Sequence, residues 1–114
     1  MPYIEAKLSV KLDDAQKDDL QAKLTDVVSR AFSKPKAYIM TTIEDEKSIY
    51  MAGNKPESAA YISVSLLGNA MKPACQDAIK GICDVLAADF KISGSNVYVT
   101  FHPADLWGWN GSMF

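Results

Sequence analysis

Pro2, the second residue of the chain, offers the most unusual chemistry in the sequence. Removal of Met1 turns Pro2 into a free secondary amine on a rigid ring. An α-amino group titrates at about 7.7 to 8.0 in peptides, and burial or a neighbouring cation lowers that pKa further. The neutral amine is then a usable general base. The structural alternative is that Pro2 opens an edge strand, where a missing backbone donor is tolerated.

Other catalytic and ligand-binding patterns are missing from the sequence. It contains no glycine-rich phosphate loop and no CxxC motif. His102 is the single histidine, which disfavours both a metal site and a Ser-His-Asp triad. Cys75 and Cys83 lie in an apolar helical pattern, and their spacing favours small core residues over a redox or metal pair. We therefore expect no metal and no cofactor.

The composition predicts one folded domain over residues 1–114. Lys and Arg number 12 against 14 Asp and Glu, and 48% of the residues are hydrophobic. This nearly neutral charge predicts neither nucleic-acid nor membrane binding. No apolar run is long enough to span a membrane, and Glu5 and Lys7 stand where a signal peptide needs apolar residues. We expect a cytoplasmic protein, or one secreted without a signal peptide.

Two similar βαβ patterns must position Pro2. The first half, about residues 2–50, alternates apolar and polar residues and then changes to helical spacing, which Pro35 ends. The second half, about residues 58–114, repeats this order, and "AKLSVKL" aligns with "AYISVSL". The predicted elements are a strand over Ile4–Leu12, a helix from about Asp14 to Ser33, a strand over 37–44, a strand over 60–67, a helix from Ala74 to about Phe90 and a strand over 96–102.

The predicted fold class is α/β, with a four-stranded sheet and two helices on one face, because right-handed crossovers place both helices on the same side. A ferredoxin-like arrangement has a similar number of elements and stays open from the pattern alone. Glu5, Lys7, Ser63 and Ser65 make the other sheet face polar. The exposed edges of such a sheet favour pairing with another subunit.

Five segments resemble, in order and spacing, the macrophage migration inhibitory factor family, which includes D-dopachrome tautomerase. They are "MPYI", "SKPKAYIM", "SVSLLG", "VYVTF" and "WGWNGSMF". The resemblance covers essentially the whole chain. It implies a homotrimer with active sites between subunits, and keto-enol tautomerase activity on phenylpyruvate-like or dopachrome-like compounds. The N-terminal proline, here Pro2, would move the proton.

The resemblance also implies roles for other residues of the site. Lys34 would bind a substrate carboxylate or enolate and lower the pKa of the amine, although it would equally complement a helix C-terminus. Tyr98 would come from a neighbouring subunit and donate a hydrogen bond to the substrate; ordinary strand packing is the alternative. The remaining substrate-binding positions implied by the family are Tyr3, Tyr38, Leu67, Thr100, Trp107, Trp109 and Phe114. The C-terminal tail would contact ligand or seal a groove between subunits.

Several residues depart from the best-known members of the family. Tyr3 replaces Met, Thr100 replaces Asn, and Trp107 replaces a smaller aliphatic residue, which implies a bulkier pocket mouth and a changed substrate preference. Leu67 replaces an isoleucine whose backbone N–H faces substrate, so this change is expected to be near neutral. Ala59 and Ile62 stand at the cysteine positions of a CxxC motif found in some members, which implies that thiol-oxidoreductase activity is absent.

The sequence leaves two other functions open. Some members of the family signal through receptors, so the chain is alternatively a cytokine-like protein that binds a cell-surface receptor and whose pocket is vestigial or a docking surface. A weaker alternative is an unrelated ferredoxin-like ligand-binding module, which predicts a monomer or dimer.

Overall fold

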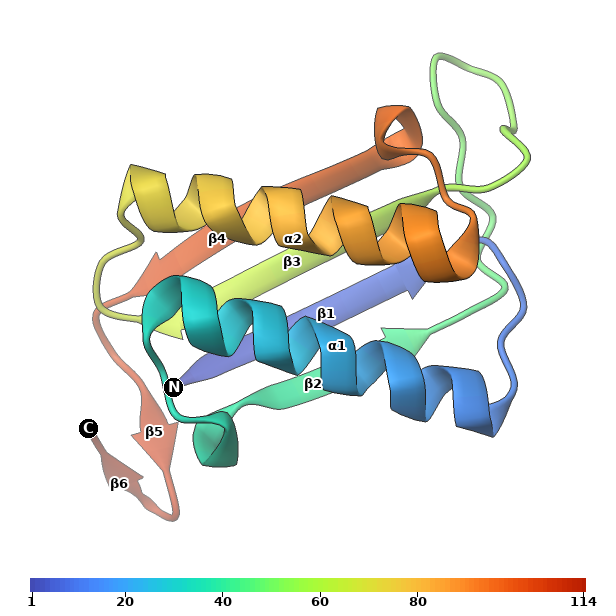
Figure 1. Cartoon of the computed structure of the whole chain (residues 1–114). Helices are drawn as coiled ribbons and strands as arrows, with labels where there is room; N and C mark the ends of the chain where they lie inside the picture. Colours follow the sequence, from blue (N-terminus) through green and yellow to red (C-terminus); the bar gives the residue numbers. More distant parts are fainter.

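The computed structural model describes all 114 residues and shows a four-stranded mixed sheet covered on one face by two helices (Figure 1). This confirms the predicted fold class. The elements are β1 (Pro2–Leu8), α1 (Asp14–Phe32), the short 3₁₀ helix η1 (Lys36–Tyr38), β2 (Met40–Glu44), β3 (Ala60–Leu67), α2 (Lys72–Phe90), the 3₁₀ helix η2 (Gly94–Asn96), β4 (Val97–Ala104), β5 (Gly108–Trp109) and β6 (Ser112–Met113).

The strand order β2-β1-β3-β4 decides between the two topologies that the sequence left open. β1 and β2 are parallel neighbours, β3 and β4 are parallel neighbours, and β1 and β3 pair antiparallel at the centre. Each long helix thus joins two adjacent strands. In a ferredoxin-like fold the βαβ unit is split by another strand, so the tandem βαβ arrangement is correct.

The core lies between the sheet and the two helices, where burial follows the predicted periodicities. Alternate residues of β1 and β3 are buried, as are residues of α1 at spacings of four. Asp13 caps α1, because its side chain accepts a hydrogen bond from the backbone N–H of Gln16 at 2.8 Å. The principal sheet and α1 residues of this core are Ile4, Ala6, Leu8, Leu20, Leu24, Val28, Ile62, Val64 and Leu66.

The buried stripe of α2 includes neither of the two cysteines that the sequence pattern favours as core residues. It is formed by Ala78, Ile82 and Leu86, at helical spacings of four. Cys83 packs against the core from its margin, whereas Cys75, in the first turn of α2, is not among the core residues. Both thiols are free, and burial raises the pKa of each. A raised pKa reduces the thiolate fraction that reacts.

β1 ends at Leu8, four residues before the end that the alternation over Ile4–Leu12 predicted. The chain bends after Leu8, where Ser9 donates its backbone N–H to the Ala59 carbonyl at 3.0 Å. The Leu12 N–H then reaches the Asp45 carboxylate at 2.8 Å. The apolar alternation continues past Leu8 because Leu12 is still buried. The backbone of Leu12, however, bonds a residue of a loop and not a neighbouring strand.

The second predicted strand, over 37–44, begins later than expected. Residues Lys36–Tyr38 form the η1 turn, and β2 starts only at Met40. Pro35 precedes the turn in an extended conformation, and the backbone N–H groups of Tyr38 and Ile39 bond back to the carbonyls of Pro35 and Lys36. This turn determines where the Tyr38 side chain lies.

The sheet face opposite the helices is polar, as predicted. Tyr3 donates its hydroxyl hydrogen to Thr42 at 2.8 Å, from β1 to β2. On β3 and β4, Tyr61 and Thr100 share a hydrogen bond of 2.7 Å, and Thr100 shares another of 2.8 Å with His102. The bonds of Tyr3 and Tyr61 join side chains across neighbouring strands, which stabilises a face that no helix covers, and the Thr100–His102 bond links two residues of β4.

Neither long helix combines the length and the apolar character needed to span a bilayer. No three His, Cys, Asp or Glu side chains are grouped closely enough to hold a metal ion.

Candidate active site

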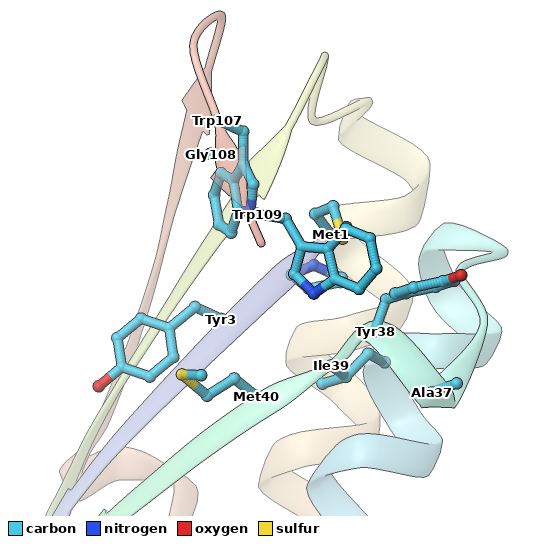
Figure 2. Close-up of a pocket in the computed structure, with 10 residues that line it drawn as sticks. Met1, Tyr3, Ala37, Tyr38, Ile39, Met40, Trp107, Gly108 and Trp109 are labelled. Atoms are coloured by element: carbon cyan, nitrogen blue, oxygen red, sulfur yellow. The ribbon is translucent and has the colours of Figure 1, made fainter. Parts of the chain in front are cut away.

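A cavity of about 580 Å³ lies at the end of the sheet where β1 and β2 begin (Figure 2). Its walls come from three segments, residues 1–3, 37–40 and 107–109, and eight of its ten lining residues are hydrophobic. Volumes of about 300 to 1,000 Å³ with mostly apolar walls are typical of small-molecule sites. The cavity therefore suits a small ligand with a substantial apolar part.

Pro2 lines this cavity and is buried. Its strand is central in the sheet, so the expectation of an edge strand was wrong. Pro2 pairs with Leu66 of β3, and the next residue, Tyr3, pairs with Met40 of β2. The first position of a strand tolerates a proline even in the interior of a sheet, because the missing N–H falls where the hydrogen-bonded ladder ends. Strands on both sides thus hold the Pro2 nitrogen in a defined place.

Met1 lines the same cavity. It is half-buried, and its carbonyl, just before β1, accepts a hydrogen bond from the Leu67 N–H of β3 at 3.4 Å. Burial lowers the pKa of the Met1 α-amino group from its ordinary value of 8.0, and the positive charge of Lys34 lowers it further. An amine at this end of the sheet is therefore biased toward its neutral form.

Lys34 supplies this charge from the end of α1 without lining the cavity. Ser33 ends the helix in a left-handed conformation, with φ of 54°. Lys34 then donates its N–H to the Ser29 carbonyl, and its own carbonyl accepts a bond from the Ser29 hydroxyl. The Lys34 ammonium forms no ion pair, unlike Lys36, which binds Asp26 at 2.9 Å. An unpaired ammonium beside the cavity is available to an anionic ligand group.

Aromatic side chains from two distant segments close the cavity. The rings of Tyr38 and Trp109 meet edge to face, with centroids 5.9 Å apart, and the centroid of the Phe114 ring lies 6.0 Å from that of Trp109. Figure 2 shows the indole of Trp109 beside Met1 and Tyr38. Tyr3 lines the cavity too, although its hydroxyl is bonded to Thr42. Phe114 does not line the cavity, but its ring packs at a tilt against that of Trp109.

A C-terminal hairpin that the sequence analysis missed positions Trp109. β5 and β6 pair antiparallel, and Phe114 donates its N–H to the Trp107 carbonyl at 2.8 Å. The turn between the strands is Asn110-Gly111, with φ of 51° and 79°. Two positive φ values are the mark of a type I′ turn, for which Asn-Gly is the preferred sequence. The dipeptide "NG" was therefore the signal that would have predicted this hairpin.

Gly111→Ala is expected to weaken substrate binding by loosening Trp109. No atom lies within 4 Å of the added Cβ, so the cost is backbone strain alone, on the order of 1–2 kcal/mol. We expect KM for an aromatic substrate to rise several-fold with little change in kcat. Gly94→Ala is the matched control, because Gly94 also has open space around it but lacks a positive φ. Equal KM values for the two variants would contradict this role of the hairpin.

Two predicted site residues lie far from the cavity within this chain. Tyr98 of β4 pairs with Tyr61 of β3. Leu66, the β3 partner of Pro2, pairs instead with Pro103 of β4. Five residues of strand separate these two pairs, or about 16 Å. Thr100 lies between them and bonds Tyr61 and His102. A ligand in the cavity therefore meets neither Tyr98 nor Thr100 of its own chain.

The cavity also has lining residues that the sequence analysis did not select, namely Met1, Ala37, Ile39, Met40 and Gly108. Three of them flank Tyr38 in the η1 turn and the start of β2, so the misplaced start of the second strand concealed them. Leu67 was selected for its backbone N–H, and the structure directs that N–H at the carbonyl of Met1.

The whole chain is similar to proteins of one family. The family model described as Macrophage migration inhibitory factor (MIF) matches residues 1–114. The macrophage migration inhibitory factor of Xenopus tropicalis is 33% identical over 104 residues, which cover 89% of each chain. The crystal structure of Leishmania major MIF2 superposes with a TM-score of 0.92 at 26% identity, covering 100% of this chain and 97% of that one. A homologue from Prochlorococcus marinus gives a TM-score of 0.87 at 27% identity, with 98% of each chain covered.

Proposed function

Because the chain belongs to the macrophage migration inhibitory factor family, we propose that it is a keto-enol tautomerase of phenylpyruvate-like or dopachrome-like compounds. Pro2 is the general base once Met1 is removed. The observation that carries this proposal is the place of Pro2: it is buried at an aromatic cavity, at the end of the sheet where the pKa of a terminal amine is lowered.

The proposed reaction moves one proton. The neutral Pro2 amine removes the proton from the substrate hydroxyl of the enol, or from the carbon next to the carbonyl in the reverse direction, and returns it at the other atom. Negative charge develops on the substrate oxygen during this transfer, so a donor aimed at that oxygen stabilises the transition state. Pro2 ends each cycle neutral, and no cofactor takes part.

Leu67 and Lys34 are the proposed partners of the substrate oxygens. Removal of Met1 deletes the carbonyl that accepts the Leu67 N–H, which frees this donor at the start of β1. Lys34 would bind the substrate carboxylate, because its ammonium has no carboxylate partner in the protein. The aryl group of the substrate would lie against Tyr38 and Trp109, whose edge-to-face pair forms one wall.

We further propose a homotrimer in which Tyr98 of one subunit completes the site of the next. Tyr98, Leu106 and Met113 leave 65%, 74% and 68% of their surfaces exposed in the single chain. Both sheet edges, β2 and β4, also lack a partner strand, and natural proteins rarely leave such edges open. Tyr98 would then supply a hydrogen bond that no residue of the same chain provides.

Subunit mixing tests both the activity and the shared site. The chain beginning at Pro2 should accelerate the enol-to-keto conversion of 4-hydroxyphenylpyruvate, whereas Tyr98→Ala should lower kcat/KM about tenfold, near the value of one lost hydrogen bond. Unfolding and refolding Tyr98→Ala together with Pro2→Gly should create sites with both native residues, so the mixture should exceed the mean rate of the two variants. A mixture no faster than that mean would contradict the shared site, and a wild-type rate equal to the uncatalysed rate would overturn the function.

A further inference from the structure

We propose that Thr42, a residue outside the cavity, determines which substrates the site prefers by holding the ring of Tyr3 to one side. The site would then favour compounds with two fused rings over compounds with one. The inference rests on the proposed function, because it concerns the substrate of the same site. Thr42 acts on the substrate only through Tyr3, so it is a positioning residue.

The first observation is the hydrogen bond that fixes Tyr3. Tyr3 lines the cavity, whereas Thr42 does not. The Tyr3 hydroxyl donates to the Thr42 Oγ1 at 2.8 Å in a partly buried setting. Figure 2 shows the Tyr3 ring pointing away from the indole of Trp109, with the hydroxyl at its far end. The bond therefore holds the ring in an orientation that leads away from Trp109.

The second observation is the register of β1 and β2. Met40 is directly opposite Tyr3, and Thr42 lies two positions further from the cavity, on the same face of the sheet. The Met40 side chain is 69% exposed, and an unbranched thioether adapts to its neighbours without fixing them. The Thr42 hydroxyl thus supplies the directional contact that β2 makes with the Tyr3 side chain.

Loss of this bond would narrow the cavity. Side chains on strands commonly adopt two χ1 rotamers, and the hydroxyl of Tyr3 reaches Thr42 in the rotamer observed. The cavity volume of about 580 Å³ belongs to this bonded orientation. A Tyr3 ring that leaves Thr42 and turns toward Trp109 takes up part of that volume, so the widest ligands lose the most affinity.

The width that the bond preserves suits two fused rings. Tyr38 and Trp109 form one aromatic wall, and Tyr3 lines the cavity apart from this pair (Figure 2). A volume of about 580 Å³ falls within the range of sites that hold drug-sized ligands, which leaves room beyond a single ring. Two fused rings also bury more apolar surface than one ring does.

The test compares 4-hydroxyphenylpyruvate, which has one ring, with dopachrome, which has two. Both carry a carboxylate for Lys34, so the comparison isolates the rings. In Thr42→Val we expect KM for dopachrome to rise about fivefold with kcat unchanged, within the effect of one neutral hydrogen bond, and KM for 4-hydroxyphenylpyruvate to change less than about twofold. Thr42→Ser keeps a hydroxyl and should restore the wild-type values.

Two further variants establish that the effect passes through the Tyr3 bond. Tyr3→Phe removes the donor and should reproduce Thr42→Val, and the double variant should be no worse than either single one. Thr41→Val is the matched control on the same strand. The Thr41 hydroxyl shares a hydrogen bond of 3.3 Å with Thr25, and Thr41 does not line the cavity. This control should leave both KM values unchanged.

An unchanged KM for dopachrome in Thr42→Val and Tyr3→Phe would overturn the inference, as would an equal rise of KM for both substrates. Calorimetry with two unreactive carboxylates, indole-2-carboxylate and 4-hydroxyphenylacetate, separates this failure from that of the proposed function. We expect the wild type to bind the two-ring probe more tightly, and Thr42→Val to bind it about fivefold more weakly than the wild type does.

The two failures then differ in their results. If the probes bind as expected but neither substrate is converted, the proposed function fails and the role of Thr42 in ligand selection stands. If the wild type converts 4-hydroxyphenylpyruvate but binds the one-ring probe as tightly as the two-ring probe, the inference fails and the proposed function stands.

Discussion

A chain that retains Met1 is expected to lose about 10²- to 10⁴-fold in kcat/KM for 4-hydroxyphenylpyruvate, which is the range that a general base contributes. The Pro2 nitrogen is then a tertiary amide whose lone pair is delocalised into the carbonyl. This amide nitrogen does not accept a proton at neutral pH. The terminal amine whose pKa is lowered at this end of the sheet is then that of Met1. Enol-to-keto conversion followed by absorbance, with intact mass on the same sample, measures this loss.

Pro2→Gly is the matched control for this first prediction. A glycine at position 2 still permits removal of Met1 and still presents an amine, but it lacks the buried ring that fixes the nitrogen beside β3. We expect an activity between that of the processed wild type and that of the form with Met1. Equal rates for all three proteins would exclude Pro2 as the base, whatever the cavity binds.

Lys34→Ala is expected to lower kcat/KM at neutral pH by at least about tenfold for a substrate with a carboxylate. A hydrogen bond to a charged group is worth about 1.5–3 kcal/mol, and the Lys34 ammonium has no carboxylate partner in the protein that would compete with the substrate. The substitution also acts on the base. A cation disfavours the protonated amine, so its removal raises the pKa and leaves less neutral amine at a given pH.

The pH profile separates these two effects of Lys34. The neutral amine is the active form, so activity is lost as the pH falls through the pKa of the amine. Lys34→Ala should move this acidic limb to higher pH, and Lys34→Arg, which keeps the charge, should leave it close to that of the wild type. Lys11→Ala removes an exposed lysine beyond the other end of β1 and should change neither the limb nor KM. A limb that stays in place in Lys34→Ala would limit Lys34 to carboxylate binding.

Local patterns in the sequence predicted most of the fold. The alternation in Ile4–Leu8 and in β3 fixed two buried strand faces, and Asp13 fixed the start of α1. The errors have two causes, a contact between distant residues and a local turn. Leu12 alternates like a strand residue but bonds the distant Asp45 side chain, and Ala37 lies within the η1 turn that follows Pro35.

The site was predicted less completely, because strand order is set by pairing over long sequence distances. Nothing near Pro2 in the sequence shows that its strand is central in the sheet. Nor does the local sequence show that Pro2 pairs with Leu66 or that Tyr3 pairs with Met40. The same topology separates Tyr98 from Pro2 within one chain. The family resemblance selected these residues, whereas the hairpin at Asn110-Gly111 was available from local turn chemistry alone.

The central claim, that the end of the sheet lowers the pKa of the Pro2 amine and so favours its neutral, basic form, is tested most directly by titration of its own nitrogen. The protein beginning at Pro2 would be labelled with ¹⁵N-proline, and the Pro2 signal followed by NMR from acid to alkaline pH. We predict that its pKa lies below 8.0, the ordinary value for a terminal amine, that it coincides with the acidic limb of kcat/KM, and that it rises in Lys34→Ala. A Pro2 nitrogen that titrates above 8.0, or apart from that limb, would contradict the claim.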